Sequence, residues 1–190
     1  MQRSQEEIQR RAHDLRKQLG CRYAPSTLSR CSLPEEAARA LSKFMRNREN
    51  FLILTGPAGT GKTDIVMAMC EWVVAAFDTY RVHIESDLYD KMHPSDHHWA
   101  TKTELENFID DQFILIDDIG SHNDSSWVER ILKDTIDFRY RNRLCTVFTT
   151  NLSKYDFYKR FHPRIGSRLF ATENTVIDFT GLPDYRELGF

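Results

Sequence analysis

The eight residues GPAGTGKT at positions 56–63 constrain the fold more than any other stretch of this chain. They follow the apolar run FLILT at 51–55, which predicts a buried strand, and they precede a largely apolar segment that predicts a helix. The stretch fits the pattern G-x-x-x-x-G-K-[ST] in the strand, loop and helix setting that this pattern requires. We therefore expect a loop whose backbone N–H groups surround phosphate oxygens at a helix N-terminus.

This loop predicts the binding of ATP with Mg²⁺. Its backbone is expected to hold the phosphates, Lys62 to contact the terminal ones, and the Thr63 hydroxyl to coordinate Mg²⁺. The expected nucleotide-binding residues are Gly56, Pro57, Ala58, Gly59, Thr60, Gly61, Lys62, Thr63 and, from a later strand, Asp117.

Four further apolar runs predict a parallel sheet. They lie at 81–85, 113–117, 144–150 and 175–179, and the segments between them are long enough for helices on both faces of the sheet. The chain has 190 residues, of which 41% are hydrophobic and 28% charged, so we expect one globular core. No apolar run approaches the roughly 20 residues that cross a bilayer, and the charged N-terminus lacks the apolar stretch of a secretory signal. We expect a cytoplasmic protein without a membrane partner.

Polar side chains follow two of the predicted strands. Asp117 and Asp118 stand at the end of FILID, and Asn151 follows LCTVFTT. Carboxyl ends of parallel strands meet at the edge where such sheets bind ligands. We expect Asp117 to hold Mg²⁺ together with Thr63, Asp118 to act as the base for an attacking water, and Asn151 to hold that water.

Together, GPAGTGKT, DDIG, TTNLS and the late RIGSRLF resemble the DnaC/IstB family of AAA+ ATPases over about residues 20–186. The resemblance implies an α/β P-loop AAA+ core, with a five-stranded parallel sheet sandwiched by helices. It also implies ATP hydrolysis, self-association into a ring or spiral, and the placing of a replicative DNA helicase on single-stranded DNA. The alternatives are an IstB-like helper of DNA transposition, an ATP-dependent switch without catalysis, and a nucleotide kinase. A kinase would need a lid, and we find no segment long enough for one.

Arg164 and Arg168 stand four residues apart on one predicted helical face, with no acidic residue close in sequence to pair with either. Such a pair is also typical of a solvated helix surface. The resemblance implies instead that Arg168 acts in trans at the ATP of a neighbouring subunit and that Arg164 assists it.

Three features depart from the family. Asp118 stands where a longer glutamate is common, which predicts slow hydrolysis. Only about a dozen residues follow the last strand, so we expect no C-terminal helical lid, and Arg186 is the remaining candidate for the lid arginine. We also expect a reduced N-terminal partner-binding region, of residues 1–19 at most, in front of a core at 20–190.

That N-terminal segment carries a narrow apolar seam of Ile8, Ala12, Leu15 and Leu19, which favours one helix. The seam suits either a helix of a partner protein or the chain's own core.

Two other stretches are candidates for contacts with nucleic acid. Single-stranded DNA could contact the segment between the second and third strands, through Lys91, His97, His98, Trp99 and Lys102. The basic cluster RYRNR at 139–143 is either a phosphate-facing patch or the positive end of a helix.

Overall fold

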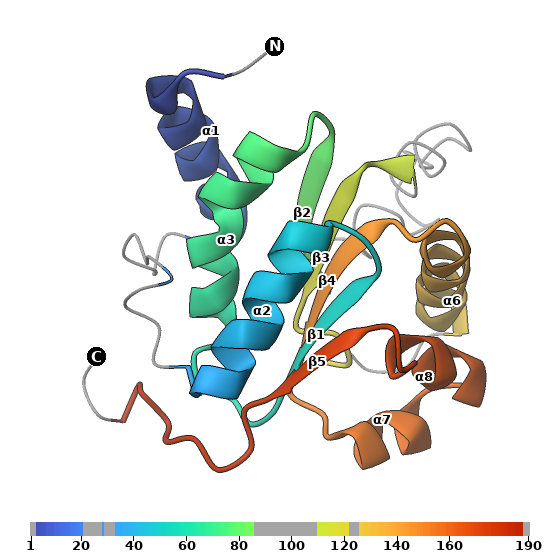
Figure 1. Ribbon diagram of the computed structural model, residues 1–190. Coiled ribbons are helices and arrows are strands. Elements are labelled where there is room, and N and C mark those ends of the chain that lie inside the picture. Colours follow the sequence, from blue (N-terminus) through green and yellow to red (C-terminus); the bar gives the residue numbers. More distant parts are fainter. Residues whose placement is uncertain (1–2, 21–27, 29–32, 86–109, 122–125, 188–190) are drawn as a thin grey trace.

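The computed structural model describes residues 3–20, 28, 33–85, 110–121 and 126–187. Five parallel strands form one sheet in the order β2-β3-β4-β1-β5 (Figure 1). The strands are β1 (Phe51–Thr55), β2 (Tyr80–Ile84), β3 (Phe113–Asp117), β4 (Cys145–Thr150) and β5 (Thr175–Asp178). The predicted sheet is confirmed, and the predicted strand ends differ from the observed ones by at most one residue.

Helices cover both faces of this sheet (Figure 1). They are α1 (Gln5–Gln18), α2 (Glu35–Asn47), α3 (Lys62–Ala76), α6 (Ser126–Arg141), α7 (Lys154–Arg160) and α8 (Pro163–Leu169). On one face, α1, α2 and α3 build an apolar core with side chains of β1, β3 and β4, such as Leu52, Leu115 and Val147. On the other face, α6, α7 and α8 pack on the alternate side chains, such as Ile53, Ile114 and Phe148. The sandwich therefore follows from the alternation of side chains along buried strands.

The described chain continues past β5 to Glu187. Between β5 and Glu187 the structure contains turns and extended chain and no helix. None of the helices in the described ranges has both the length and the apolar character needed to span a bilayer.

Arg139 connects α6 to the sheet. Its side chain is fully buried and donates to Thr146 Oγ1 at 2.8 Å, to the carbonyl oxygen of Cys145 at 2.8 Å and to that of Asp111 at 2.7 Å. Burial lowers the pKa of this guanidinium to about 10. The idea that the cluster 139–143 faces phosphate is therefore wrong for Arg139, which packs inside the protein at the last turn of α6.

Helix α1 packs against the chain's own α3. Ala12, Leu15 and Leu19 are buried in the same core as α3, and Ile8 packs against that core. Arg3 donates to the carbonyl oxygens of Val74 and Phe77, which lie at the C-terminal end of α3. Of the two arrangements that the seam allows, the structure has the second, and α3 occupies the surface that a partner helix would need.

We expect Leu15→Ala to destabilise the protein by about 2–5 kcal/mol, because it leaves a cavity in a closely packed site. Arg10→Ala, on the exposed side of the same helix, is the matched control and should change stability by less than about 0.5 kcal/mol. Urea unfolding followed by circular dichroism measures both. Equal stabilities for the two variants would mean that α1 detaches from α3 in solution.

Candidate nucleotide-binding and catalytic site

The loop between β1 and α3 has the backbone geometry of a phosphate cradle. Gly56, Gly59 and Gly61 have φ angles of 133°, 77° and 91°, values that side chains disfavour. Gly61 is the N-cap of α3 and offers no side chain to cap it, so the first N–H groups of the helix remain open to an anion. Thr60 closes the loop from inside, through a hydrogen bond of 2.9 Å from its hydroxyl to the carbonyl oxygen of Pro57.

Lys62 lies almost completely buried at the first position of α3, with an exposed fraction of 6%. Its ammonium group donates to the carbonyl oxygens of Gly56 and Pro57, both at 2.7 Å, and to Asn151 Oδ1 at 2.9 Å. Burial lowers the pKa of Lys62, while the charges of Asp118 and Asp117 act in the opposite direction. The loop thus holds a desolvated cation where the terminal phosphates of a nucleotide would need one.

Asp117 ends β3 and faces the start of α3. Its Oδ2 lies 3.5 Å from the hydroxyl of Thr63, and its Oδ1 accepts a hydrogen bond of 2.5 Å from Thr149. The exposed fraction of Asp117 is 7%, and this burial raises its pKa although the hydrogen bond from Thr149 lowers it. A hydroxyl next to a buried carboxylate is a donor set that suits Mg²⁺, and the two residues fit the predicted metal site.

Asp118 and Asn151 meet as the sequence predicts. Asn151 Nδ2 donates to Asp118 Oδ1 at 2.5 Å, and the same amide group accepts from Lys62. Asp118 has a φ of 62°, the left-handed region that costs a residue other than glycine about 1–2 kcal/mol. Its backbone N–H donates to Thr149 Oγ1 at 2.8 Å, which holds this conformation. Such strain often marks a functional position.

Two residues that support these acids were not predicted from the sequence. Thr149 makes hydrogen bonds with both acids. The sequence feature that could have indicated this role is its position in the TTN stretch, at the end of the strand that pairs with β3. Glu85 is buried directly after β2 and accepts from the N–H groups of Gly120 and Ser121, so it holds the loop that follows Asp118. The sequence feature that could have indicated Glu85 is its position as the acidic last residue of the run RVHIE.

The C-terminal tail lies against the phosphate loop. The N–H of Tyr185 donates to the carbonyl oxygen of Gly59 at 3.0 Å, and a Cβ on Gly59 would meet Asp184 Oδ1 at 1.9 Å. Burial raises the pKa of Asp64 and lowers that of Lys62, and the positive charge of Arg186 acts to lower both. The tail therefore brings Arg186 near the loop, although no helical lid carries it.

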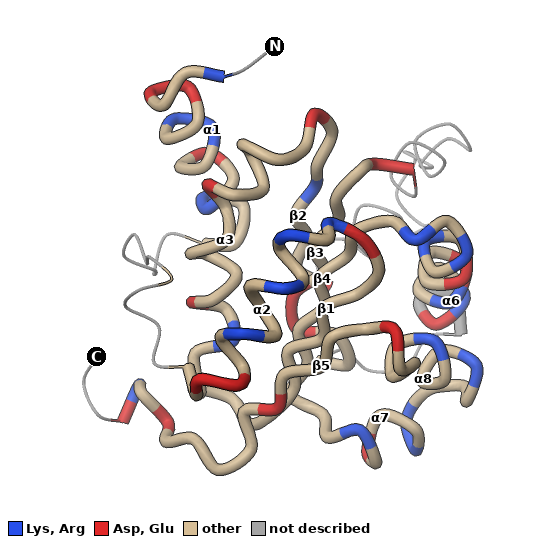
Figure 2. Tube along the Cα trace, in the orientation of Figure 1, with Lys and Arg blue, Asp and Glu red and all other residues tan. Residues whose placement is uncertain are grey.

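Arg164 and Arg168 lie on α8, and their expected lack of an acidic partner is wrong. Asp137 of α6 pairs with both of them, at 3.1 Å from an Nη of Arg164 and at 2.8 Å from Nε of Arg168. Figure 2 shows basic positions along α7 and α8, beside α6. The sequence interpretation failed because Asp137 lies far along the chain and reaches the arginines only through helix packing.

The candidate DNA contacts Lys91, His97, His98, Trp99 and Lys102 lie outside the described residues. In the described part of the chain, no group of three or more His, Cys, Asp or Glu residues could hold a metal ion.

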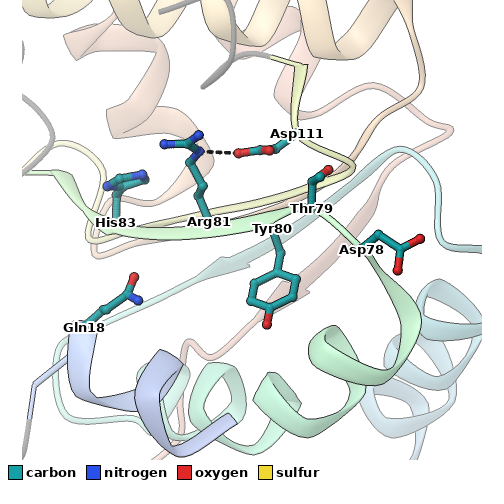
Figure 3. A pocket seen from close by; sticks show the side chains of 7 residues that line it. All are labelled: Gln18, Asp78, Thr79, Tyr80, Arg81, His83 and Asp111. Atoms are coloured by element: carbon teal, nitrogen blue, oxygen red, sulfur yellow. Dashed lines mark hydrogen bonds and ion pairs between the residues drawn. The ribbon is translucent and has the colours of Figure 1, made fainter. Parts of the chain in front are cut away.

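A separate hollow of about 420 Å³ lies beside the edge strand β2 (Figure 3). Arg81 and His83 point to one side of the strand and Tyr80 to the other, while Gln18 reaches it from the end of α1. Arg81 pairs with Asp111 across its rim. The hollow contains none of the residues predicted from the sequence to bind nucleotide.

The sequence model of one protein family, the IstB-like ATP binding proteins, matches residues 32–165, which is more than half of the chain. This chain belongs to that family. The match includes the phosphate loop, both acids and Asn151, and the DnaC/IstB resemblance seen in the sequence is confirmed.

Solved structures agree with the AAA+ fold. A crystal structure of DnaI has a TM-score of 0.71 and 19% identity, covering 92% of this chain and 99% of that one. A DnaC helicase loader has a TM-score of 0.63 and 25% identity, covering 82% of this chain and 93% of that one. The replication initiator DnaA, bound to AMPPCP and single-stranded DNA, has a TM-score of 0.67 and 16% identity, over 82% of this chain and 50% of that one.

A viral protein is also similar to this chain. Polyprotein-FSD of Solenopsis invicta virus 3 is 26% identical over 144 residues, which are 76% of this chain and 4% of the polyprotein. The chain thus spans a small part of the length of that relative.

We expect Asp117→Asn to stabilise the ligand-free protein at neutral pH while weakening Mg²⁺-dependent ATP binding. The pKa of Asp117 is raised above its ordinary value of 3.8, so ionising it costs folding free energy. This cost is absent well below pH 3.8 and is complete above the raised pKa. Thermal melts across pH 3–8 should therefore show a difference that grows with pH, by about 2–4 °C per kcal/mol.

Asp14→Asn, at an exposed position of α1, is the control and should leave the melting temperature unchanged. A lower melting temperature for Asp117→Asn at neutral pH would mean that the carboxylate stabilises the empty site.

Proposed function

We propose that this chain is an ATPase that self-assembles into a ring or spiral and helps to place a replicative ring helicase on single-stranded DNA. The observation that carries the proposal is the series of contacts from Lys62 through Asn151 to Asp118. Binding of phosphate needs only the loop and Lys62. An amide and a second carboxylate beside them are the groups that place and deprotonate an attacking water.

Each residue has a defined part in the proposed reaction. Lys62 exchanges its contacts with loop carbonyls for oxygens of the terminal phosphates, and Asn151 orients the water. Asp118 accepts the proton, and its short side chain is consistent with slow turnover. Thr63 and Asp117 would hold Mg²⁺, which neutralises phosphate charge when bound.

The arginines of α8 extend the proposal to a second subunit. Arg168 stabilises the charge that develops on the γ-phosphate of a neighbouring chain, and Arg164 assists it. This role requires self-association. Of the two arginines on α8, Arg164 is half exposed and Arg168 is partly exposed.

Helicase loading is supported by the likeness to the DnaC helicase loader, which extends over 93% of that structure. Binding of single-stranded DNA is supported more weakly, since DnaA shares the fold at 16% identity. Lys91, His97, His98, Trp99 and Lys102 remain the proposed contacts.

A role in transposition is the second candidate, because the matching family is described by its likeness to IstB. Affinity capture from cells with the full chain, ATP and Mg²⁺, with and without single-stranded DNA, separates the two. We expect a ring helicase among the captured proteins, whereas a transposase in its place would favour the second candidate.

We expect Asp118→Asn to bind ATP and Mg²⁺ but to lose turnover, because an amide cannot accept the proton of water. Arg168→Ala should also bind ATP and should hydrolyse it about 10³-fold more slowly, the low end for such arginines in other P-loop enzymes. Mixing the two should restore part of the phosphate release, since one supplies an intact ATP site and the other an intact arginine.

Full activity of Arg168→Ala would remove the arginine from the mechanism. If subunits exchange but phosphate release does not recover at any mixing ratio, action of Arg168 in trans would be contradicted. Nucleotide binding without phosphate release by the wild-type protein, with its captured partner present, would favour the switch that lacks catalysis.

A further inference from the structure

Asp137 lies between the two arginines that the proposed function uses. It belongs to α6, its residue is 8% exposed, and its two carboxylate oxygens face one arginine each. Its backbone carbonyl accepts from Nε of Arg141. Figure 1 shows α6 and α8 side by side, so the acid reaches the arginines across a packed helix pair.

The contact engages Arg168 through its inner nitrogen. Nε lies 2.8 Å from Asp137 Oδ1, although neither atom makes a well-directed hydrogen bond within the described residues. Nη1 makes a long contact of 3.4 Å to the carbonyl oxygen of Arg164, and Nη2 makes no hydrogen bond in the described part of the chain. A guanidinium has five N–H donors, so both terminal nitrogens are left for an incoming anion.

Other contacts limit how Arg168 can turn. Its side chain is 19% exposed, and its guanidinium lies 5.8 Å from the centre of the Tyr140 ring. Tyr140 in turn donates its hydroxyl to Glu173. Arg168 is therefore held on its inner side by a ring and a carboxylate, as a positioned group and not as a loose surface cation.

From this geometry we propose that Asp137 is a positioning residue for the arginine pair. It holds Nε of Arg168, and through its second oxygen an Nη of Arg164, so that the free edge of Arg168 is directed toward the ATP of a neighbouring chain. The inference rests on the proposed function, because it assigns a task to the same arginines. In this proposal Asp137 acts through the arginines and not by direct contact with nucleotide or the attacking water.

The test compares Asp137→Ala and Asp137→Asn with Asp134→Ala. Asp134 lies about one turn earlier on α6, is half exposed and, among the residues that the structure describes, pairs with Arg130 at 3.9 Å, so it is a matched control. We expect Asp137→Ala to lower kcat at least about tenfold while KM for ATP stays within about twofold. Asp137→Asn keeps an oxygen that can accept from Nε of Arg168 but loses the charge. Its kcat should therefore lie between those of Asp137→Ala and the wild type. Asp134→Ala should match the wild type.

Mixing distinguishes a misdirected arginine from a damaged ATP site. Asp137→Ala combined with Asp118→Asn should regain turnover to the extent that Arg168→Ala combined with Asp118→Asn does. Asp137→Ala combined with Arg168→Ala should regain none. The double variant Asp137→Ala, Arg168→Ala should lose no more activity than Arg168→Ala alone, and this comparison holds whether the arginine acts in cis or in trans.

Wild-type kcat in both Asp137 variants, with Arg168→Ala inactive, would overturn the role of Asp137 and leave the proposed function in place. Faster turnover in either variant would mean that Asp137 restrains the arginines, and this would also overturn its positioning role. Full activity of Arg168→Ala would remove both proposals. If the melting curve shows that Asp137→Ala does not fold, the same kcat and KM measurements on Asp137→Asn test the role of Asp137.

Discussion

Parallel pairing of β1, β3 and β4 is the constraint on which the candidate site depends. The register sets Thr55 beside Thr150 and Ile116 beside Phe148, so the three strands end at one level of the sheet. Each strand is buried along its whole length, and the first polar groups beyond it therefore emerge together. The phosphate loop, the two acids and Asn151 converge without any long excursion of the chain.

The same site lowers the folding stability of the protein when no ligand is bound. Burial disfavours the charged forms of both Lys62 and Asp117, and Asp118 has a left-handed backbone. Contacts from Asn151 and Thr149 offset part of this cost. A bound nucleotide with its cation would supply opposite charges to both groups, so binding energy and stability are coupled here.

The sequence predicted what local patterns encode and missed what packing decides. The loop, the acids and Asn151 were found because each follows its strand directly, and the strands are continuous apolar runs. Asp137 was missed because only the packing of α6 on α8 joins it to Arg168. For residues 3–19 the pattern left two choices, since a narrow seam fits a partner as well as α3. Burial of Arg139 was equally hidden, because a basic cluster normally indicates a surface.

Lys62, buried at the first position of α3, is expected to bind the phosphates of ATP. Titration calorimetry of wild-type protein and Lys62→Ala with ATP and Mg²⁺ measures the contribution of this side chain. We expect saturable binding by the wild type and a loss of at least about 100-fold in affinity for the variant, because a charged contact to phosphate is removed. Undiminished affinity in a folded Lys62→Ala protein would contradict this role of Lys62.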